Sequence, residues 1–233
     1  MRKKVIAIIL AAGKGSRMNS ELPKQYIPLY GKPMLFYSLQ AFSLSEVDEI
    51  ILVTGKEEIE YCKTRIVEEY GFSKVTKIVA GGEERYHSVY KGLLEAKGAD
   101  YVLIHDGARP LVTKDLIHMA IKEVKKTGAC VVGMPVKDTI QLVTEEKVIE
   151  STPVRKNTWL AQTPQCFEYL LALNSYEEAI RQEDNTITDD AMVVMKYGNR
   201  AVSMIEGSYE NIKVTTSEDI LLAKLFLKKR GPL

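Results

Sequence analysis

The sequence predicts an α/β protein in which a mostly parallel sheet carries helices on both faces. Short apolar runs rich in β-branched residues, such as Val5–Ala12 and Glu49–Thr54, have the composition of strands buried on both sides. Segments with apolar residues at every third or fourth position, such as Lys114–Lys126, separate these runs and have the pattern of amphipathic helices. Because strands and helices alternate, neighbouring strands should be parallel and joined by helical crossovers.

The elements can be assigned in chain order. After the first strand, Leu35, Leu39 and Phe42 share one helical face, and Pro33 lies near the start of that helix. Further strands are expected at Glu49–Thr54, Lys77–Ala80, Tyr101–Ile104, Cys130–Met134, Ala201–Ile205 and Asn211–Thr215. Further helices are expected at 59–70, Glu83–Ala96, Lys114–Lys126 and Phe167–Ile180, at Asp189-Asp190 after a Thr188 cap, and after a Thr216/Asp219 capping box. This order is typical of a Rossmann-like fold.

The alternation stops at Pro135. Thr139–Val143 and Val148–Thr152 are short β-rich runs around the polar turn Thr144–Lys147, which predicts a hairpin. Its charged neighbours favour a protruding arm, at about residues 136–156, on a single domain of residues 1–233. An isolated hairpin is marginal in water, so we expect the arm to pack against a second copy of the chain; packing on its own domain is the alternative.

Composition excludes several classes of function. An apolar content of 45% supports a full core, and a net charge of +1 gives no global field that would favour nucleic acid or an anionic membrane. No apolar run approaches the ~20 residues of a membrane span. The cysteines, Cys62, Cys130 and Cys166, lack metal-ligand spacing and predict buried thiols in a reducing cytoplasm. Reading residues 2–13 as a signal peptide is the alternative, and it would remove the first strand.

The loop after the first strand combines small residues with cations. In order it contains Ala11, Ala12, Gly13, Gly15, Arg17 and Lys24. Where Cβ atoms are small or absent, the backbone can approach a ligand and direct its N–H groups at an anion. The position of Met18 does not fit a dinucleotide fingerprint, and a Walker A order is absent. The loop therefore predicts a phosphate site, with a tight turn bearing surface cations as the alternative.

Two later loops follow strands in the same way. Gly81-Gly82 and Ser88 could lie against a flat base and read the edge of a pyrimidine, while Arg85 could hold this loop or be a surface charge. His105–Pro110 reads HDGARP, where Asp106 can bind ribose hydroxyls or Mg²⁺ and Arg109 can bind a phosphate. A salt-bridged Asp106–Arg109 pair that only stabilises the turn is the alternative.

Smaller polar groups are scattered over the rest of the chain. They are Asp138-Thr139, Arg155, Thr163-Pro164-Gln165, Thr188-Asp189-Asp190 and Asn211-Ile212-Lys213. Each alone has the pattern of a turn or cap, but together they would supply donors to a polyol phosphate. The stock of cations, hydroxyls and glycine amides suits phosphoryl chemistry, which depends on positioning and charge neutralisation.

The motifs LAAGKGSRM, LPKQY, GGEERYHSV, HDGARP, PVKDTI, TPQ, TDDA and NIKVT occur in one order across nearly the whole chain. In this order the chain resembles the 2-C-methyl-D-erythritol 4-phosphate cytidylyltransferases, a family of sugar- and polyol-phosphate nucleotidyltransferases of the non-mevalonate isoprenoid pathway. The related ribitol 5-phosphate cytidylyltransferases typically have Ala-Gly-Gly and Asp-Ser-Val-Arg where this chain has Ala11–Gly13 and Asp106–Arg109. That enzyme is the alternative. Glu210 stands where the family usually has aspartate.

The resemblance implies a reaction and a set of roles. CTP would be joined to 2-C-methyl-D-erythritol 4-phosphate, with Mg²⁺ bound mainly through the CTP phosphates and no metal site made by the protein. Residues implied to bind CTP are Ala11, Ala12, Gly13, Gly15, Gly82, Ser88, Asp106 and Ala108. The implied catalytic residues are Arg17, Lys24, Arg155 and Lys213, and those around the acceptor are Arg109, Asp138, Thr139, Thr163 and Thr188. The family also implies a homodimer with interlocked arms. The chain could instead be a hexose 1-phosphate nucleotidyltransferase or a nucleotide-binding regulator without catalysis.

Overall fold

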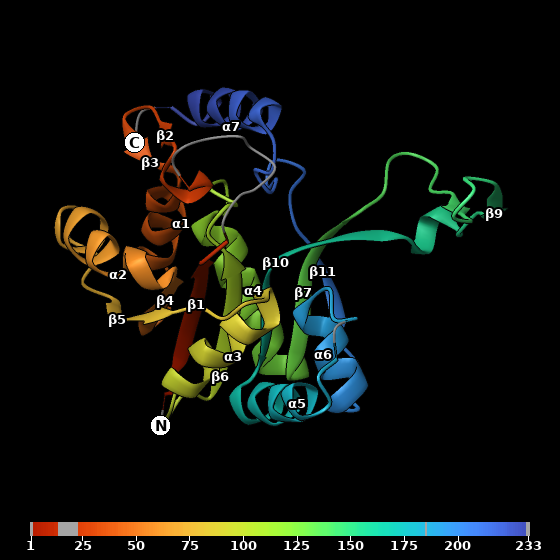
Figure 1. Ribbon diagram of the computed structural model, residues 1–233, viewed down its shortest axis with the longest axis horizontal. Helices are drawn as coiled ribbons and strands as arrows, with labels where there is room; N and C mark the ends of the chain where they lie inside the picture. The colour runs from red at the N-terminus through yellow and green to blue at the C-terminus, as the bar shows by residue number, and fades with distance from the viewer. Residues whose placement is uncertain (1, 14–22, 185, 232–233) are drawn as a thin grey trace.

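The computed structural model describes residues 2–13, 23–184 and 186–231, and its central feature is a sheet in the order β11-β7-β10-β6-β1-β4-β5 (Figure 1). The strands are β1 (Val5–Ala11), β4 (Glu49–Thr54), β5 (Val75–Ala80), β6 (Tyr101–Asp106), β7 (Ala129–Pro135), β10 (Trp159–Glu168) and β11 (Ser203–Glu206). Two short strands, β2 (Pro28–Leu29) and β3 (Lys32–Pro33), pair separately. The predicted mostly parallel sheet is therefore confirmed.

The direction of the chain across the sheet reverses at β1. Strands β1, β4 and β5 are successive parallel neighbours on one side, whereas β6 pairs in parallel with β1 on the other side. In open α/β sheets, ligands bind beyond the carboxyl ends of the strands where the order reverses. The loop of small residues follows β1, and Asp106 ends β6. Because these two strands are parallel neighbours, the topology brings the loop and Asp106 together.

The strands bury both faces under helices. Along β1, Ala7 and Ile9 belong to one apolar cluster, and Ile6 and Ile8 belong to the other. The first cluster contains residues of α1 (Met34–Ser43), η4 (Cys62–Glu68), α4 (Lys114–Thr127) and α7 (Ser217–Lys229); the second contains residues of α3 (Arg85–Glu95), α5 (Tyr169–Arg181) and α6 (Asp190–Tyr197). This confirms the predicted helices on both faces.

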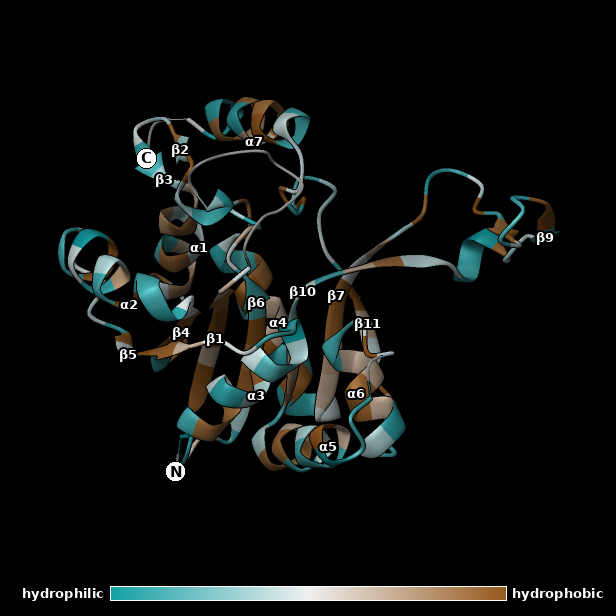
Figure 2. Cartoon of the chain, viewed as in Figure 1, coloured by the Kyte–Doolittle hydropathy of each residue, from teal (hydrophilic) through white to brown (hydrophobic). Residues whose placement is uncertain are grey.

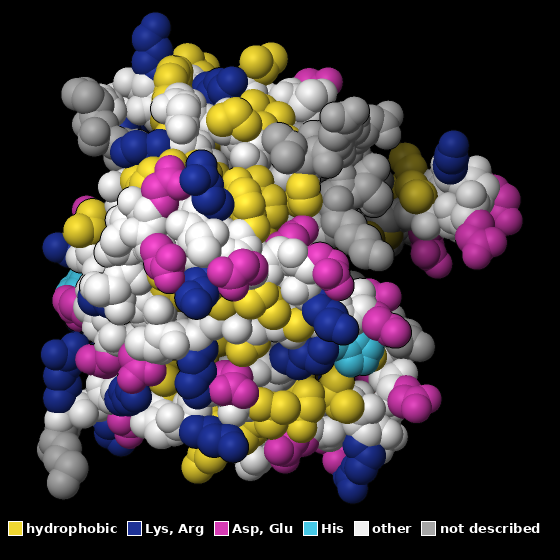
Figure 3. Space-filling model, turned by 60° about the vertical axis from the view of Figure 1, so that its left-hand side comes forward, with side chains coloured by type: hydrophobic (Ala, Val, Ile, Leu, Met, Phe, Trp, Pro, Cys, Tyr) yellow, Lys and Arg dark blue, Asp and Glu magenta, His cyan; other side chains and the backbone are white. Residues whose placement is uncertain are grey.

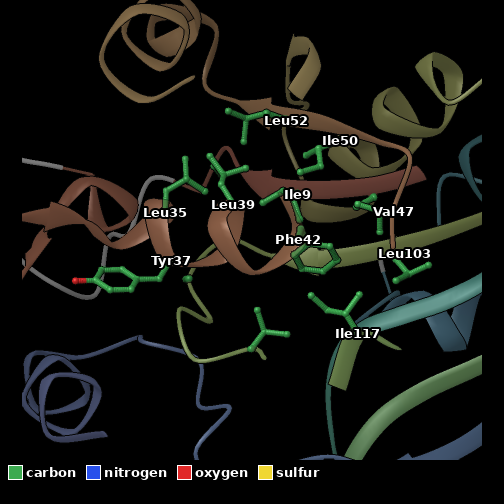
Figure 4. Close-up of a cluster of buried hydrophobic side chains, with 14 of the residues drawn as sticks. Ile9, Leu35, Tyr37, Leu39, Phe42, Val47, Ile50, Leu52, Leu103 and Ile117 are labelled. Atoms are coloured by element: carbon green, nitrogen blue, oxygen red, sulfur yellow. The ribbon is translucent and has the colours of Figure 1, made fainter. Parts of the chain in front are cut away.

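Apolar side chains fill the space between sheet and helices. Figure 2 shows the central strands as the most hydrophobic part of the chain. In Figure 4, Leu39 and Phe42 of α1 lie beside Ile9 of β1, Leu52 of β4 and Leu103 of β6. These side chains are fully buried, so α1 is held by burial of its apolar face rather than by a polar N-cap, which Pro33 does not supply.

The chain between β7 and β10, residues 136–158, carries the predicted hairpin and extends away from the body in Figure 1. Its hairpin is shorter than expected, with strands β8 (Leu142–Val143) and β9 (Ile149–Ser151). Lys147 has a φ of 64° in the turn, and its N–H donates to the carbonyl of Thr144. A protruding hairpin is thus confirmed.

One boundary prediction is wrong. Phe167 and Glu168 do not begin a helix, because they complete β10, where Phe167 pairs with Val102 of β6 and Ala129 of β7. The helix α5 begins at Tyr169. Strand β10 as a whole was not predicted, and it is antiparallel to both neighbours. Its central Gln162–Gln165 stretch is polar and interrupts the ladder, which hides the strand from an analysis of apolar periodicity.

Two smaller predictions near the carboxyl end are also corrected. The cap of α6 is Asp189, whose carboxylate accepts from the N–H of Met192, and the helix begins at Asp190 rather than directly after a Thr188 cap. Asn211–Thr215 forms no strand, because the segment is tied to several loops instead of to a sheet edge. The Thr216/Asp219 capping box of the last helix is confirmed.

The face drawn in Figure 3 carries charges of both signs. Lys and Arg side chains lie interspersed there with Asp and Glu. Within the described ranges, none of the helices combines the length and the hydropathy that crossing a bilayer requires.

The close contact between α3 and the sheet generates a stability prediction. A Cβ on Gly92 would lie 2.5 Å from Ile8 Cγ2 and 3.2 Å from Val53 Cγ2. Alanine is intrinsically better than glycine in a helix by ~1 kcal/mol. We nevertheless expect Gly92→Ala to lower the free energy of unfolding by about 1–3 kcal/mol, because the helix must move off the sheet. Urea denaturation measures this; a Gly92→Ser variant should lose more, and a stabilised Gly92→Ala would contradict the prediction.

Candidate active site

A cleft opens beyond the carboxyl ends of β1 and β6, with an empty volume of about 670 Å³. It is lined by residues from five separate stretches of the chain: Leu10, Ala11, Ala12, Gly13, Lys24, Gln25, Gly82, Glu83, Glu84, Arg85, Ser88, Asp106, Ala108 and Lys213. The loops that follow β1, β5 and β6, each singled out in the sequence, therefore line one cleft.

The first and second loops touch each other at glycine. A Cβ on Gly81 would lie 2.5 Å from Ala12 Cβ and 2.8 Å from Ser88 Oγ, so only glycine allows this approach. The N–H of Gly82 donates to Ser88 Oγ at 3.0 Å, and Ser88 Oγ donates to the carbonyl of Glu84. Ser88 therefore fixes the Gly81-Gly82 loop as well as lining the cleft.

Lys24 begins a tightly anchored turn, η2 (Lys24–Tyr26). The amide of Gln25 donates to the carbonyl of Ala11 at 2.7 Å and to the Glu58 carboxylate at 3.3 Å. The hydroxyl of Tyr26 donates to the same Glu58 oxygen at 2.8 Å. Gln25 thus ties the Lys24 turn to the end of β1, and Glu58, which accepts from Thr54, ties it to the end of β4. Lys24 Nζ itself donates to the carbonyl of Val214 at 3.3 Å.

Asp106 lies between two cations at the floor of the cleft. Its Oδ1 accepts from Arg85 Nε at 3.1 Å, and its Oδ2 lies 2.8 Å from Lys213 Nζ. Burial by itself would raise the pKa of Asp106, but Arg85 and Lys213 lower that pKa well below its usual range. The carboxylate therefore stays ionised at any physiological pH and can accept hydrogen bonds from a ligand.

The Asp106–Arg109 ion pair that was the alternative to ligand binding is not formed in the described part of the chain. Arg109 Nη1 instead donates to the carbonyl of Asn211 at 2.8 Å. The amide of Asn211 donates to the carbonyl of Thr163 and to Gln162 Oε1. Arg109 and Asn211 thus hold the 211–215 segment against β10 by hydrogen bonds. Lys213 lies on this segment and is positioned by it.

His105 and Thr163 lie beneath the cleft. Thr163 Oγ1 and His105 Nδ1 are 2.9 Å apart, and Thr163 Oγ1 accepts from the N–H of Asp106 at 3.2 Å. Both side chains are buried. Burial lowers the pKa of His105 to about 3, so the ring is neutral. Through Thr163 it supports the backbone of Asp106.

Other predicted site residues lie outside the cleft of this single chain. Asp138, Thr139 and Arg155 are exposed on the arm. Thr188 is exposed before α6, and its hydroxyl contacts Met192 Sδ at 3.8 Å. Gly15 and Arg17 lie outside the described residues.

Comparison with known proteins decides the family. The sequence matches the model of the 2-C-methyl-D-erythritol 4-phosphate cytidylyltransferase family over residues 5–229. The chain belongs to this family. The predicted resemblance is therefore confirmed, as is the enzyme class of the family, the nucleotidyltransferases.

Individual relatives of the family cover almost the whole chain. The 2-C-methyl-D-erythritol 4-phosphate cytidylyltransferase of Lachnoclostridium phytofermentans is 47% identical over 227 residues, which are 97% of each chain. That of Lachnospira eligens is 48% identical over 224 residues, 95% of this chain and 98% of the relative. The crystal structure of 4-diphosphocytidyl-2C-methyl-D-erythritol synthase from Anaerococcus prevotii has a TM-score of 0.85 at 33% identity, covering 97% of this chain and 96% of that one. None of these names favours the ribitol alternative.

Three contacts of this family member could not be assigned from its sequence. Arg85, left open between a surface charge and a loop anchor, forms ion pairs with both Asp106 and Asp190. Glu58 anchors the Lys24 turn from a distant element, and its only sequence signal is that it follows a strand. His87 accepts a hydrogen bond from the N–H of Glu84 and packs on Tyr86, so its ring caps the start of α3.

A protein-made metal site is not a feature of the described ranges, where no three His, Cys, Asp or Glu side chains are grouped to hold an ion. Asp106 is the carboxylate at the cleft floor, and both its oxygens already contact cations. Glu210 is engaged elsewhere, in ion pairs with Lys229 and Arg230.

The neutral, buried His105 generates a pH prediction. Its pKa of about 3 lies below the ~6.5 of an unfolded histidine. As pH falls below about 6.5, His105 binds a proton in the unfolded state but stays neutral in the folded state. The free energy of unfolding therefore decreases. Between pH 7 and pH 5 we expect this group to account for ~2 kcal/mol of the loss. Denaturant unfolding of wild type and His105→Gln at both pH values measures the difference, which should be smaller in the variant.

A second histidine provides the control for that experiment. His118 is exposed on α4 beside Glu46. His118→Gln should keep most of the wild-type loss of stability between pH 7 and pH 5. Equal losses in wild type and His105→Gln would show that the buried ring does not resist protonation.

Proposed function

We propose that this protein transfers the cytidylyl group of CTP to 2-C-methyl-D-erythritol 4-phosphate, giving 4-diphosphocytidyl-2-C-methyl-D-erythritol and pyrophosphate. One observation supports the proposal above the others. Lys24, Asp106 and Lys213, from three distant parts of the chain, line one cleft together with the small residues that end β1. Family membership supports the substrates, because the relatives described above carry the name of this reaction.

The nucleotide would occupy the cleft at the reversal point of the sheet. Ala11–Gly13 have small or absent side chains that let the triphosphate approach the backbone. Gly82 and Ser88 would contact the cytosine, and the loop of Asp106 and Ala108 would contact the ribose. The chemistry fits, since an ionised carboxylate accepts hydrogen bonds from hydroxyl groups. Gly15 and Arg17 are proposed to complete the phosphate contacts.

The chemical step needs no base on the enzyme. A phosphate oxygen of the acceptor forms a bond to the α-phosphorus of CTP while the bond from that phosphorus to the bridging oxygen breaks, and pyrophosphate leaves with the electron pair. The nucleophile is already an anion, so the protein's task is to neutralise charge and align the reactants. Lys24 and Arg17 would stabilise the charge on the α-phosphoryl oxygens. When bound to the triphosphate, Mg²⁺ would withdraw charge from the same oxygens.

The acceptor would be held by Lys213 and Arg155, with Arg109, Asp138, Thr139, Thr163 and Thr188 around it. Lys213 is already in the cleft, whereas Arg155 lies on the arm of the same chain. We therefore propose that the arm, on a single domain of residues 1–233, completes the site of a second copy in a homodimer.

Exposed apolar side chains on and beside the arm support this assembly. Val148 and Ile149 are each 62% exposed, and Val154 is 59% exposed. An apolar group of this kind on a thin projection gains stability when a partner covers it. We also place the enzyme in the cytoplasm, since its three cysteines are buried free thiols, as expected in a reducing compartment.

A substrate panel tests the reaction. Purified protein with Mg²⁺ should release pyrophosphate from CTP only when a suitable polyol phosphate is added. We expect 2-C-methyl-D-erythritol 4-phosphate to give a kcat/KM at least ~10²-fold above that of ribitol 5-phosphate or a hexose 1-phosphate, because the site's polar groups are arranged for one acceptor. Coupled detection of pyrophosphate measures the rates. Preference for ribitol 5-phosphate, or CTP binding with no product from any acceptor, would overturn the proposal.

Two single substitutions test the charges. Lys24→Ala should lower kcat by about 10²–10³-fold because it removes a contact to the reacting phosphoryl group. Arg155→Ala should lower kcat/KM by a comparable factor through the acceptor. The melting temperature of each variant should stay close to that of wild type, since both side chains are at least partly exposed. Full turnover by Lys24→Ala would remove that residue from the mechanism.

Mixing these two variants tests whether the arm acts on the partner. If Arg155 serves the other subunit, a mixed dimer of Lys24→Ala and Arg155→Ala contains one intact site and one doubly altered site. Random exchange of subunits should then restore about one quarter of wild-type activity. Each variant mixed with itself is the control. No recovery, after mass spectrometry has shown that mixed dimers form, would mean that Arg155 acts only within its own chain.

A further inference from the structure

Arg85 occupies an unusual position between two carboxylates at the cleft. Its Nη1 and Nη2 donate to the two oxygens of Asp190 at 2.7 and 2.8 Å, while its Nε donates to Asp106 Oδ1 at 3.1 Å. One guanidinium therefore uses its paired donors on one carboxylate and its remaining edge on the other. This fixed geometry is a property of arginine that lysine cannot reproduce.

Asp190 is itself firmly held. It is completely buried at the first position of α6, where a helix N-terminus favours negative charge. The hydroxyl of Tyr176 on α5 donates to Asp190 Oδ1. The start of α6 is tied to β10 by Gln165, which accepts from the N–H of Ala191 and donates to Asp189. Asp190 is therefore held in place by α5, α6 and β10, and it in turn holds Arg85.

The Asp106 carboxylate is held less firmly, by Arg85 on one oxygen and Lys213 on the other. The side chain of Lys213 is 36% exposed, on a segment without regular structure. A carboxylate offers about four lone-pair sites on two oxygens. With one site taken by Arg85 and one by Lys213, acceptors remain for ligand hydroxyls. The orientation of these acceptors depends on the more firmly held of the two cations, which is Arg85.

We propose that Arg85, fixed by Asp190, is a positioning residue that orients the Asp106 carboxylate toward the ribose hydroxyls of the nucleotide and so contributes to the selection of ribonucleotides. This inference rests on the proposed function, which places the ribose beside Asp106. It assigns the second aspartate of the TDDA motif to the support of the nucleotide site rather than to contact with a substrate.

A comparison of CTP with 2′,3′-dideoxy-CTP tests the proposal. The dideoxy compound lacks both hydroxyls that Asp106 could accept from. Wild type should use CTP with a kcat/KM about 10- to 100-fold above that for the dideoxy compound, which is the expected value of lost hydrogen bonds to a charged group. In Arg85→Lys and Asp190→Asn this ratio should fall to less than about threefold, with the loss on CTP appearing mainly in KM.

The ratio is insensitive to misfolding. Both nucleotides are assayed on the same sample, so a reduced folded fraction cancels, while a general distortion of the cleft would slow both substrates and leave the ratio unchanged. Arg65→Lys is a matched control, because Arg65 makes an exposed ion pair with Glu69 on the opposite face of the sheet, and it should retain the wild-type ratio.

The outcomes separate this inference from the proposed function. Failure of wild type to form pyrophosphate from CTP and 2-C-methyl-D-erythritol 4-phosphate, or equal use of both nucleotides by wild type, would overturn the proposed reaction or the placing of the ribose. An active wild type that prefers CTP, together with Arg85→Lys and Asp190→Asn variants that keep the same preference, would overturn the role of Arg85 alone.

Discussion

The charge of Asp106 is the constraint on which the rest of the cleft depends. A carboxylate buried at the end of β6 would be expelled or protonated without compensation, and the fold supplies that compensation from both sides through Arg85 and Lys213. These cations come from the helix after β5 and from the segment before α7. Neutralising one side chain thus brings together parts of the chain that are more than a hundred residues apart.

The fold could be predicted where each element carries its own pattern. Strands β1, β4 and β6 are apolar runs, and α4 has the spacing of an amphipathic helix with Thr113 as its cap, so sequence analysis located them to within a few residues. Strand β10 carries no such local pattern and was not predicted. It has polar residues at its centre, and what makes it a strand is pairing with β6 and β7, a long-range property that local periodicity does not record.

In the candidate site, too, the location could be predicted from local patterns, whereas the long-range contacts could not. The positions of small residues and cations after strands located most of the cleft, because parallel strands place their carboxyl ends at one edge. Pairings between side chains could not be obtained in this way. The sequence suggested Asp106 and Arg109 as partners because they are neighbours, whereas Arg85 and Lys213 contact Asp106 and Arg109 holds the backbone at Asn211. Motif spacing identifies which groups are present at a site but not how their charges are matched.

The place at which the arm leaves the sheet has a consequence for how this architecture can vary. Trp159 pairs with Pro135, so the two strands flanking the arm are already side by side where it begins and ends. A tight turn could join them without altering any other strand or either apolar cluster. The projection is therefore an insertion into a body that is topologically closed without it. Its length and sequence can therefore change while the sheet and the cleft at its edge are preserved.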